Sequence, residues 1–258
     1  MLGLIIPVYN FQHGLEHTFT RLVDWRQKHP NYAYKLCLVD DGSNDGSAEL
    51  LDSFAKANPD WVTILTMSQN QGKGACIKKG FLLLARHCQK IIFTDCDLYY
   101  GLDLIPAATD ELDRSDIVIL DRSLFYSYGT RSPYRNLASR LFNKFICLLT
   151  GVSFFDTQAG FKAFRTDVCE PIFKHLQIQR FAFDVELLAH ATRYLLRIHA
   201  LPVVLSEERR AEQQKSTISL STTFEVAADI VRISRILARP FPGDRELKEK
   251  LRSRIHQV

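Results

Sequence analysis

The 258-residue sequence has no long apolar run, no paired cysteine spacing and no strong excess of one charge. A membrane-spanning helix needs roughly 18 or more consecutive apolar residues, and no stretch reaches that length. The first residues, MLGLIIPVYN, have neither the charged region nor the cleavage site of a signal peptide. These absences predict a cytoplasmic protein, and any membrane contact is expected to be peripheral, at the cytoplasmic face.

The cysteines match neither a zinc site nor a dense disulfide framework, because they lack the close pairs that both require. A reducing compartment is the simpler interpretation. The six residues are Cys37, Cys76, Cys88, Cys96, Cys147 and Cys169.

The charge is distributed unevenly along the chain. The formal net charge is +4, and residues 231–258 contain eight Lys or Arg against three acids, a net of +5, so the preceding part is close to neutral. A basic tail suits an anionic membrane surface or nucleic acid. We expect no nucleic-acid binding, because no stacking or recognition motif accompanies the basic residues. The sequence predicts one domain over residues 1–220 and a basic helical segment over 221–258.

Short apolar stretches rich in β-branched residues alternate with segments long enough to form helices. This alternation is typical of an α/β fold in which helices flank a mostly parallel sheet. With 46% hydrophobic residues, the chain has enough apolar surface for a full core. The predicted strands are LGLIIPV, YKLCLVD, VTILTM, KIIFTD and DIVIL.

Polar clusters follow the first four predicted strands, where ligands bind in open α/β sheets. These clusters are PVYN, DDGSNDGS, SQNQGKG and DCD. Each cluster alone is compatible with ordinary turn and helix-cap chemistry. Four of them at successive strand ends predict a single shared site.

The DCD cluster contains two carboxylates, Asp95 and Asp97, separated by one residue. In an extended segment alternate side chains share a face, and two like charges held close together require a neighbouring positive charge. The alternative interpretation is a strand end that runs into a solvated loop. A divalent cation accounts for the pair, because Mg²⁺ binds one or two carboxylates together with substrate phosphates.

Taken in order, IPVYN, VDDGSNDGS, NQGKGACIKKG and DCD resemble the family 2 glycosyltransferases, which have the Rossmann-like GT-A fold. Further along, DTQAGFKAF at 156–164 and FAFDVELL at 181–188 resemble the polyprenyl-phosphate branch, in particular the dolichyl-phosphate glucosyltransferases and the related mannosyltransferases. The resemblance extends from about residue 3 to about residue 220. The ordered set is far more specific than any single motif.

The resemblance assigns a donor site to the first hundred residues. It implies that Asp95 and Asp97 hold Mg²⁺ or Mn²⁺ against the diphosphate of a nucleotide sugar. The remaining donor-site candidates are Asp40 and Asp41 over the nucleoside, Pro7 and Tyr9 in the pocket wall, and Lys73 near a phosphate or a sugar hydroxyl. A surface lysine in a glycine turn is the alternative for Lys73.

Two positions depart from the pattern of the relatives. Phe11 stands where many relatives have an acidic residue, and Tyr99 stands where mannosyltransferases often have Gln. The sequence therefore leaves unassigned one of the expected contacts to the nucleoside and the third ligand of the metal.

The resemblance also implies an acceptor site. A phosphate monoester has its second pKa near 6 and is already ionised at neutral pH, so a polyprenyl phosphate needs cations more than a general base. Arg131 is the leading candidate for the acceptor phosphate, in a stretch that also contains Arg135, Arg140 and Lys144. An amphipathic helix with a solvated basic face is the alternative.

Three acidic or amide side chains complete the predicted site. By resemblance, Asp156 and Gln158 line the sugar or acceptor pocket, and Asp184 falls where many family members have their base. As an alternative, Asp184 caps the helix that begins there. If the acceptor is a phosphate, Asp184 orients groups without taking a proton.

The C-terminal stretch repeats apolar residues at helical spacing: Val226, Ile230, Ile233 and Leu237. Arg232, Arg235 and Arg239 accompany them. A basic amphipathic helix is typical of a membrane-surface element. Packing of the same stripe on the domain is the alternative.

The resemblance predicts an inverting hexosyltransferase that uses a divalent metal and transfers a hexose to a polyprenyl phosphate. UDP-glucose is the first expected donor and GDP-mannose the second. One alternative is transfer to a saccharide hydroxyl, which would require Asp184 as a base. Another is a nucleotide-sugar-binding protein without catalytic activity, which the altered Phe11 and Tyr99 keep open.

Overall fold

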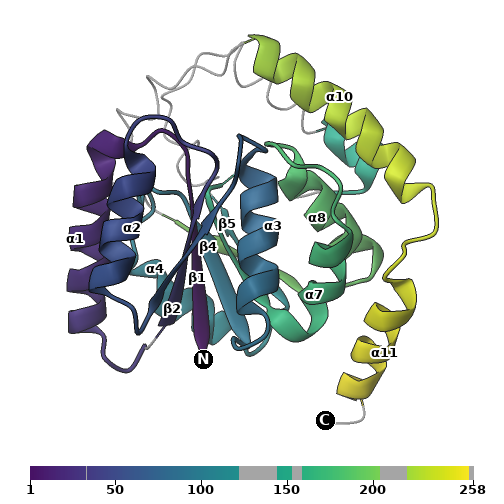
Figure 1. Ribbon diagram of the computed structural model, residues 1–258. Helices are drawn as coiled ribbons and strands as arrows, with labels where there is room; N and C mark the ends of the chain where they lie inside the picture. Colours follow the sequence, from purple (N-terminus) through teal and green to yellow (C-terminus); the bar gives the residue numbers. More distant parts are fainter. Residues whose placement is uncertain (33, 122–143, 153–158, 204–219, 256–258) are drawn as a thin grey trace.

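The computed structural model describes residues 1–32, 34–121, 144–152, 159–203 and 220–255 (Figure 1). Within these residues, seven strands form one sheet in the order β3-β2-β1-β4-β6-β5-β7, and of these β6 alone runs antiparallel to its neighbours. The strands are β1 (Leu2–Val8), β2 (Tyr34–Asp40), β3 (Val62–Thr66), β4 (Lys90–Thr94), β5 (Ile117–Asp121), β6 (Phe161–Arg165) and β7 (Ile198–Pro202).

The described helices cover both faces of the sheet and continue beyond it at the C-terminus (Figure 1). They are α1 (Gln12–Lys28), α2 (Ser47–Ala57), α3 (Lys73–Leu84), α4 (Leu104–Glu111), α7 (Thr166–His175), α8 (Phe183–Arg193), α10 (Leu220–Leu237) and α11 (Asp244–Ile255). The prediction of a mostly parallel α/β sheet with flanking helices is confirmed, and all five predicted strands are present.

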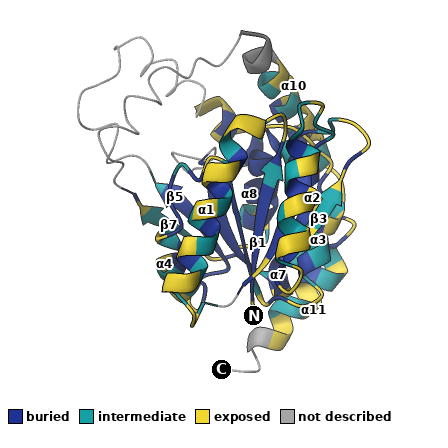
Figure 2. Cartoon of the chain, turned by 60° about the vertical axis from the view of Figure 1, so that its left-hand side comes forward, coloured by how far each residue is buried: buried dark blue, intermediate teal, exposed yellow. Residues whose placement is uncertain are grey.

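The alternation of side chains along each strand divides the core into two layers. In β1, Ile5 contacts the layer formed with α3, α7 and α8, whereas Leu4 and Ile6 contact the layer formed with α1, α2 and α4. The inner strands are accordingly buried on both faces, the edge strands β3 and β7 are partly exposed, and the helices expose their outer sides (Figure 2). This pattern explains why the strands read as nearly continuous apolar runs.

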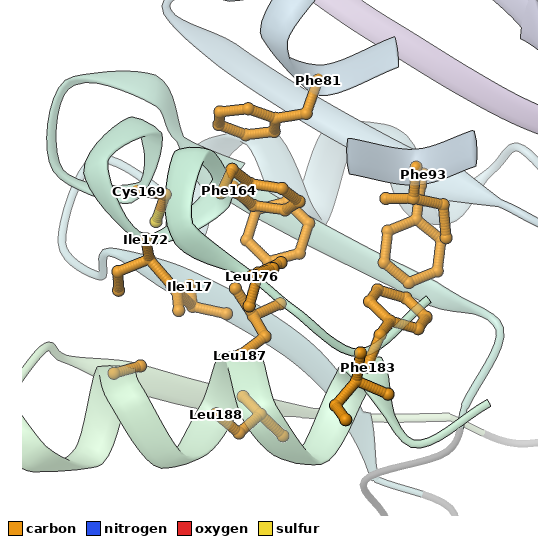
Figure 3. Close-up of a cluster of buried hydrophobic side chains, with 14 of the residues drawn as sticks. Phe81, Phe93, Ile117, Phe164, Cys169, Ile172, Leu176, Phe183, Leu187 and Leu188 are labelled. Carbon is orange, nitrogen blue, oxygen red and sulfur yellow. The ribbon is translucent and has the colours of Figure 1, made fainter. Parts of the chain in front are cut away.

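Aromatic rings fill the layer under α3, α7 and α8 (Figure 3). Phe81 of α3 stacks on Phe173 of α7 with ring centroids 3.7 Å apart, and Phe164 of β6 meets both rings edge-on. These contacts fix α3 and α7 relative to β6, and α3 begins at Lys73 within the SQNQGKG cluster.

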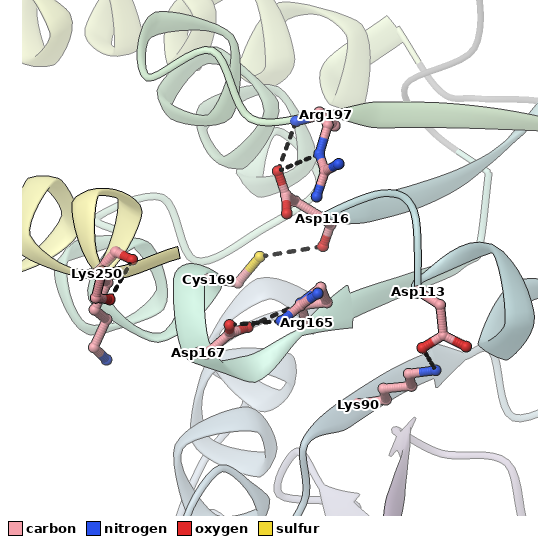
Figure 4. A network of polar contacts seen from close by, with 9 residues as sticks. Lys90, Asp113, Asp116, Arg165, Asp167, Cys169, Arg197 and Lys250 are labelled. Carbon is pink, nitrogen blue, oxygen red and sulfur yellow. Dashed lines mark hydrogen bonds and ion pairs between the residues drawn. The ribbon is translucent and has the colours of Figure 1, made fainter. Parts of the chain in front are cut away.

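A polar network closes the end of the sheet opposite to those clusters (Figure 4). The buried Asp116, just before β5, accepts a hydrogen bond of 2.8 Å from the backbone N–H of Arg197, just before β7. At the same end, Arg165 forms an ion pair with Asp167, and Lys90 forms one with Asp113. These contacts are structural, because they lie at the edge of the sheet opposite the polar clusters, where Asp116 joins the amino ends of β5 and β7.

The C-terminal helices pack on the domain. Ile230 and Ile233 of α10 are fully buried in the layer with α7 and α8, and Val226 and Leu237 are partly buried beside them. The apolar stripe therefore serves the core, as the packing alternative predicts. In the part of the chain that the structure describes, no helix combines the length and apolar character needed to cross a membrane.

Candidate active site

Strand order places the site between β1 and β4. The chain winds from β1 outward to β3, then returns to the other side of β1 with β4, and a crevice forms where the order reverses. A cavity of about 510 Å³ opens at the carboxyl ends of these strands. Six of the predicted site residues line it: Pro7, Tyr9, Asp41, Lys73, Asp95 and Asp97.

Cross-links between the loops explain why these clusters converge. The N–H of Asn10 donates to Ser43 Oγ at 3.0 Å, and Asn10 Oδ1 accepts from the N–H of Asn44 at 2.9 Å. Asp45 likewise accepts from the N–H of Gln12. The predicted convergence of the PVYN and DDGSNDGS clusters is therefore confirmed.

Asp41 holds the third cluster in place. One of its carboxylate oxygens accepts a hydrogen bond from the N–H of Gln71 at 2.7 Å, and the other accepts from the N–H of Gly72 at 2.8 Å. Asp40 is buried, accepts from the N–H of Ser43 and is not among the described residues that line the cavity. Nucleoside contact by Asp40 and Asp41 stays a prediction.

The loop that contains Asp95 and Asp97 is fixed from α1. Thr18 Oγ1 donates to the carbonyl of Cys96 at 2.6 Å, and Arg21 Nη1 donates to the carbonyl of Asp97 at 3.3 Å. Leu98 has a positive φ of 49°, which turns the chain so that the N–H of Tyr99 donates to Asp97 Oδ1. The Tyr99 side chain packs against the layer of α1 and α4.

The charges in the cavity are concentrated on this loop and on Lys73. Burial and the nearby Asp95 raise the pKa of Asp97, whereas the Tyr99 N–H and Lys73 oppose the rise. Lys73 forms an ion pair with Asp95. Burial acts to lower the pKa of Lys73, but the carboxylates of Asp95 and Asp184 outweigh it, so the pKa is raised.

Asp95 and Asp97 provide the oxygen ligands expected for a hard cation. Both aspartates line one cavity, and Asp97 bears a repulsion from Asp95 that a divalent cation would relieve. Among the described residues, no group of three or more His, Cys, Asp or Glu side chains gathers into a complete metal site. A two-carboxylate site fits a cation whose remaining ligands come from substrate phosphates.

Gly160 lies directly against Asp95. A Cβ atom placed on Gly160 would overlap the Asp95 carboxylate, and the N–H of Asp95 donates to the Gly160 carbonyl at 3.1 Å. The glycine of the AGFK segment therefore makes room for one of the two cavity aspartates.

Asp184 lies below the cavity in the protein interior. Its side chain is 5% exposed, and Oδ1 lies 2.9 Å from Nζ of Lys162, which is fully buried. Burial raises the pKa of Asp184, against the opposing charges of Lys162 and Lys73. Asp184 is not among the described residues that line the cavity.

Sequence reasoning missed three residues of this region. Lys162 belongs to the quoted DTQAGFKAF segment, where a lysine between two phenylalanines was the available signal. Arg180 and Phe181 line the cavity from the loop before α8. Arg180 directly precedes the FAFDVELL segment. The predicted residues Arg131, Asp156 and Gln158 lie outside the described residues.

The fold and the site define a glycosyltransferase of the GT-A class. The model of glycosyl transferase family 2 matches residues 4–173, and the chain belongs to this family. It is accordingly an enzyme, a hexosyltransferase, and the predicted family is confirmed.

A dolichyl-phosphate β-glucosyltransferase of Dictyostelium discoideum is 28% identical over 244 residues, which span 90% of this chain and 73% of the relative. This match confirms the resemblance to the polyprenyl-phosphate branch. Mannosyl-3-phosphoglycerate synthase from Rubrobacter xylanophilus superposes with a TM-score of 0.62 at 14% identity, covering 92% of this chain and 74% of the other.

A second solved structure, the mannosyltransferase PcManGT from Pyrobaculum calidifontis in complex with GDP-Man and Mn²⁺, has a TM-score of 0.52 at 14% identity. It covers 98% of this chain and 80% of that one. At this identity, the two structures establish the fold alone.

Proposed function

We propose that the protein transfers glucose from UDP-glucose to a polyprenyl phosphate of the dolichyl type, with inversion at the anomeric carbon. The name of the Dictyostelium relative supports both the sugar and the acceptor class. The cavity at the ends of β1 and β4 supports the position of the donor.

We propose Mg²⁺ or Mn²⁺ as the cofactor, held by Asp95 and Asp97. The Mn²⁺ in the mannosyltransferase complex supports use of a divalent ion in this fold. The ion would supply charge neutralisation for the departing nucleoside diphosphate. Lys73, which already pairs with Asp95, would contact the donor phosphates.

The burial of Asp184 is the observation that carries the acceptor class. A hydroxyl acceptor needs a general base within hydrogen-bond reach, whereas a phosphate monoester is ionised at neutral pH. Asp184 is engaged by Lys162 and lies off the described cavity wall, so it is poorly placed to take a proton. This arrangement favours a phosphate nucleophile, with Asp184 as a residue that orders the floor of the site.

The protein would meet such a lipid at a membrane surface. Arg232 and Arg235 on α10 and Arg239 just after it are exposed, while the apolar stripe of α10 is buried or partly buried. We therefore propose electrostatic, peripheral contact at the cytoplasmic face. Sedimentation with anionic vesicles should retain the protein at low salt and release it at high salt, since such attraction is screened. Equal retention on neutral vesicles would contradict this proposal.

The transfer itself is tested with radiolabelled UDP- and GDP-sugars, Mg²⁺ or Mn²⁺, and a short polyprenyl phosphate. Label from UDP-glucose should enter the organic phase, and Asp97→Ala should abolish the transfer. Transfer of label from GDP-mannose instead of UDP-glucose into the organic phase would reject UDP-glucose as the donor. Donor consumption with no label in the lipid would reject the polyprenyl phosphate and point to a hydroxyl acceptor.

A further inference from the structure

Arg180 is the cavity residue whose role the motifs leave open. It lies in the loop between α7 and α8, residues 176–182, and lines the cavity with Lys73, Asp95 and Asp97. Its side chain is 51% exposed. The guanidinium can therefore be reached by a ligand.

The backbone on either side of Arg180 is held by hydrogen bonds. The buried Glu186 accepts from the N–H groups of Gln177 at 3.0 Å and Ile178 at 2.7 Å. The carbonyl of Gln179 accepts from the N–H of Ala75 in the first turn of α3, at 2.9 Å. Because both contacts are to buried or helical groups, the loop position is fixed before any substrate binds.

The stem of Arg180 packs against the glycine turn. A Cβ atom on Gly72 would lie 2.8 Å from Cγ of Arg180 and 2.7 Å from the Gln179 carbonyl oxygen. Gly72 also has a positive φ of 100°, which favours glycine. Asp41 anchors the same turn, so its position is coupled to the position of Arg180.

The head of Arg180 is oriented from the C-terminal region. Its Nε lies 3.3 Å from Oε1 of Glu225 on α10. Among the described residues, Nη1 and Nη2 form no hydrogen bond, and Asp229 of α10 places a second negative charge near the guanidinium. The outer edge of the guanidinium, which binds phosphate through two parallel N–H groups, is therefore open.

The charge balance of the cavity calls for this cation. Among the described lining residues, Lys73 and Arg180 are the basic ones, and Lys73 is already paired with Asp95. The reaction brings a diphosphate and a phosphate into the same space. We propose that Arg180 binds a phosphate group of a substrate and that Glu225 is its positioning residue, an inference that rests on the proposed function.

The phosphate belongs either to the donor or to the acceptor, and two measurements separate these sources. One measures UDP binding by calorimetry in the presence of Mn²⁺. The other measures the KM for a short polyprenyl phosphate at saturating UDP-glucose. Arg180→Met should weaken UDP binding at least tenfold if the donor diphosphate is bound. It should instead raise the acceptor KM at least tenfold, with UDP binding unchanged, if the acceptor phosphate is bound.

Three further variants sharpen the experiment. Arg180→Lys keeps the charge but loses the two-pronged contact, so it should fall between the wild type and Arg180→Met. Glu225→Gln should raise the constant that Arg180→Met affects, either the Kd of UDP or the acceptor KM, severalfold at nearly constant kcat. The variant keeps the Arg180 guanidinium but removes the carboxylate that orients it. Arg86→Met removes one exposed charge after the far end of α3 and should change neither constant.

Values within twofold of the wild type in both measurements for a folded Arg180→Met would overturn the proposal. If the wild-type chain does not glucosylate the lipid, the proposed function fails, and the UDP measurement alone decides the role of Arg180. A tenfold loss there would support donor binding, and no loss would overturn the proposal.

Discussion

Lys162 and Asp184 form an ion pair of 2.9 Å in the protein interior, with exposed side-chain fractions of 0% and 5%. Lys162 Nζ also donates to the Ala159 carbonyl at 2.9 Å and lies 5.4 Å from the centre of the Phe93 ring. Buried charges are tolerated when they are paired, and removal of one partner leaves the other uncompensated. The pair therefore connects β6 to the start of α8 beneath the cavity.

Lys162→Met should be strongly destabilising, by roughly 3–5 kcal/mol, because Asp184 would remain as a buried charge without its partner. The free energy of unfolding in urea measures this. The double variant Lys162→Met/Asp184→Asn should recover most of the loss, since it removes both charges. A loss below about 1 kcal/mol in the single variant would contradict the interpretation.

Gly160→Ala should displace the Asp95 carboxylate, because the added methyl group would overlap it. We expect weaker Mn²⁺ binding in the presence of UDP, measured by calorimetry, with at least a tenfold loss of transfer. The matched variants are Asp95→Ala and the double variant Asp95→Ala/Gly160→Ala. If the two sites act through one contact, the double variant should be no worse than Asp95→Ala. Additive losses would show that Gly160 acts elsewhere.

His190 on α8 should make stability depend on pH. It is 2% exposed, and neither ring nitrogen has a hydrogen-bond partner among the described residues. Burial, with a smaller effect of Arg193, lowers its pKa from 6.5 to about 4. As the pH falls, His190 therefore becomes protonated near pH 6.5 in the unfolded chain but only near pH 4 in the folded chain. The free energy of unfolding falls by about 3 kcal/mol as the pH is lowered through that window.

His190→Leu should remove this part of the pH dependence. The variant should gain stability relative to the wild type at pH 5 and differ much less at pH 8, as measured by urea unfolding at both values. An equal difference at both pH values would show that His190 does not titrate as described.

Glu186→Gln should loosen the loop that contains Arg180. The carboxylate accepts hydrogen bonds from two backbone N–H groups, and the amide would turn an NH₂ group toward one of them. A loss of about 1–3 kcal/mol in unfolding free energy is expected for the buried unpaired group. Substrate binding through Arg180 should weaken with it. Unchanged unfolding would indicate that water or a rotated amide replaces the lost contact.

The convergence of the loops was predictable because parallel strands bring their carboxyl ends to one edge. The motifs at these strand ends were therefore enough to predict that Asp95, Asp97 and Lys73 share one site. The role of Lys162 was not predictable in this way. It depends on an ion pair with Asp184, which lies 22 positions further along the chain, and no local sequence pattern indicates that contact.

The sequence could not decide whether Asp184 is buried, or whether the apolar stripe of α10 packs on the domain or faces a membrane. The sequence pattern around an aspartate at the start of a helix is the same whether the side chain caps the helix, acts in catalysis or forms a buried ion pair. The spacing of Ile230 and Ile233 is equally compatible with a membrane and with a protein core. In both cases the surface that the helix meets decides the outcome, and that surface is built from α7 and α8.

The reversed direction of β6 has a consequence for how this enzyme can diversify. Because β5 ends and β6 begins at the cavity edge, the chain between Asp121 and Phe161 leaves and re-enters the sheet at that edge. The strand register and the contacts at the amino ends lie away from this interval, whereas Ile146, Val152 and Gly160 within it belong to the core or contact Asp95. We expect chimaeras that exchange the rest of the interval and keep these three residues to retain the sheet and the cavity, which makes them a direct test of whether the interval sets acceptor preference.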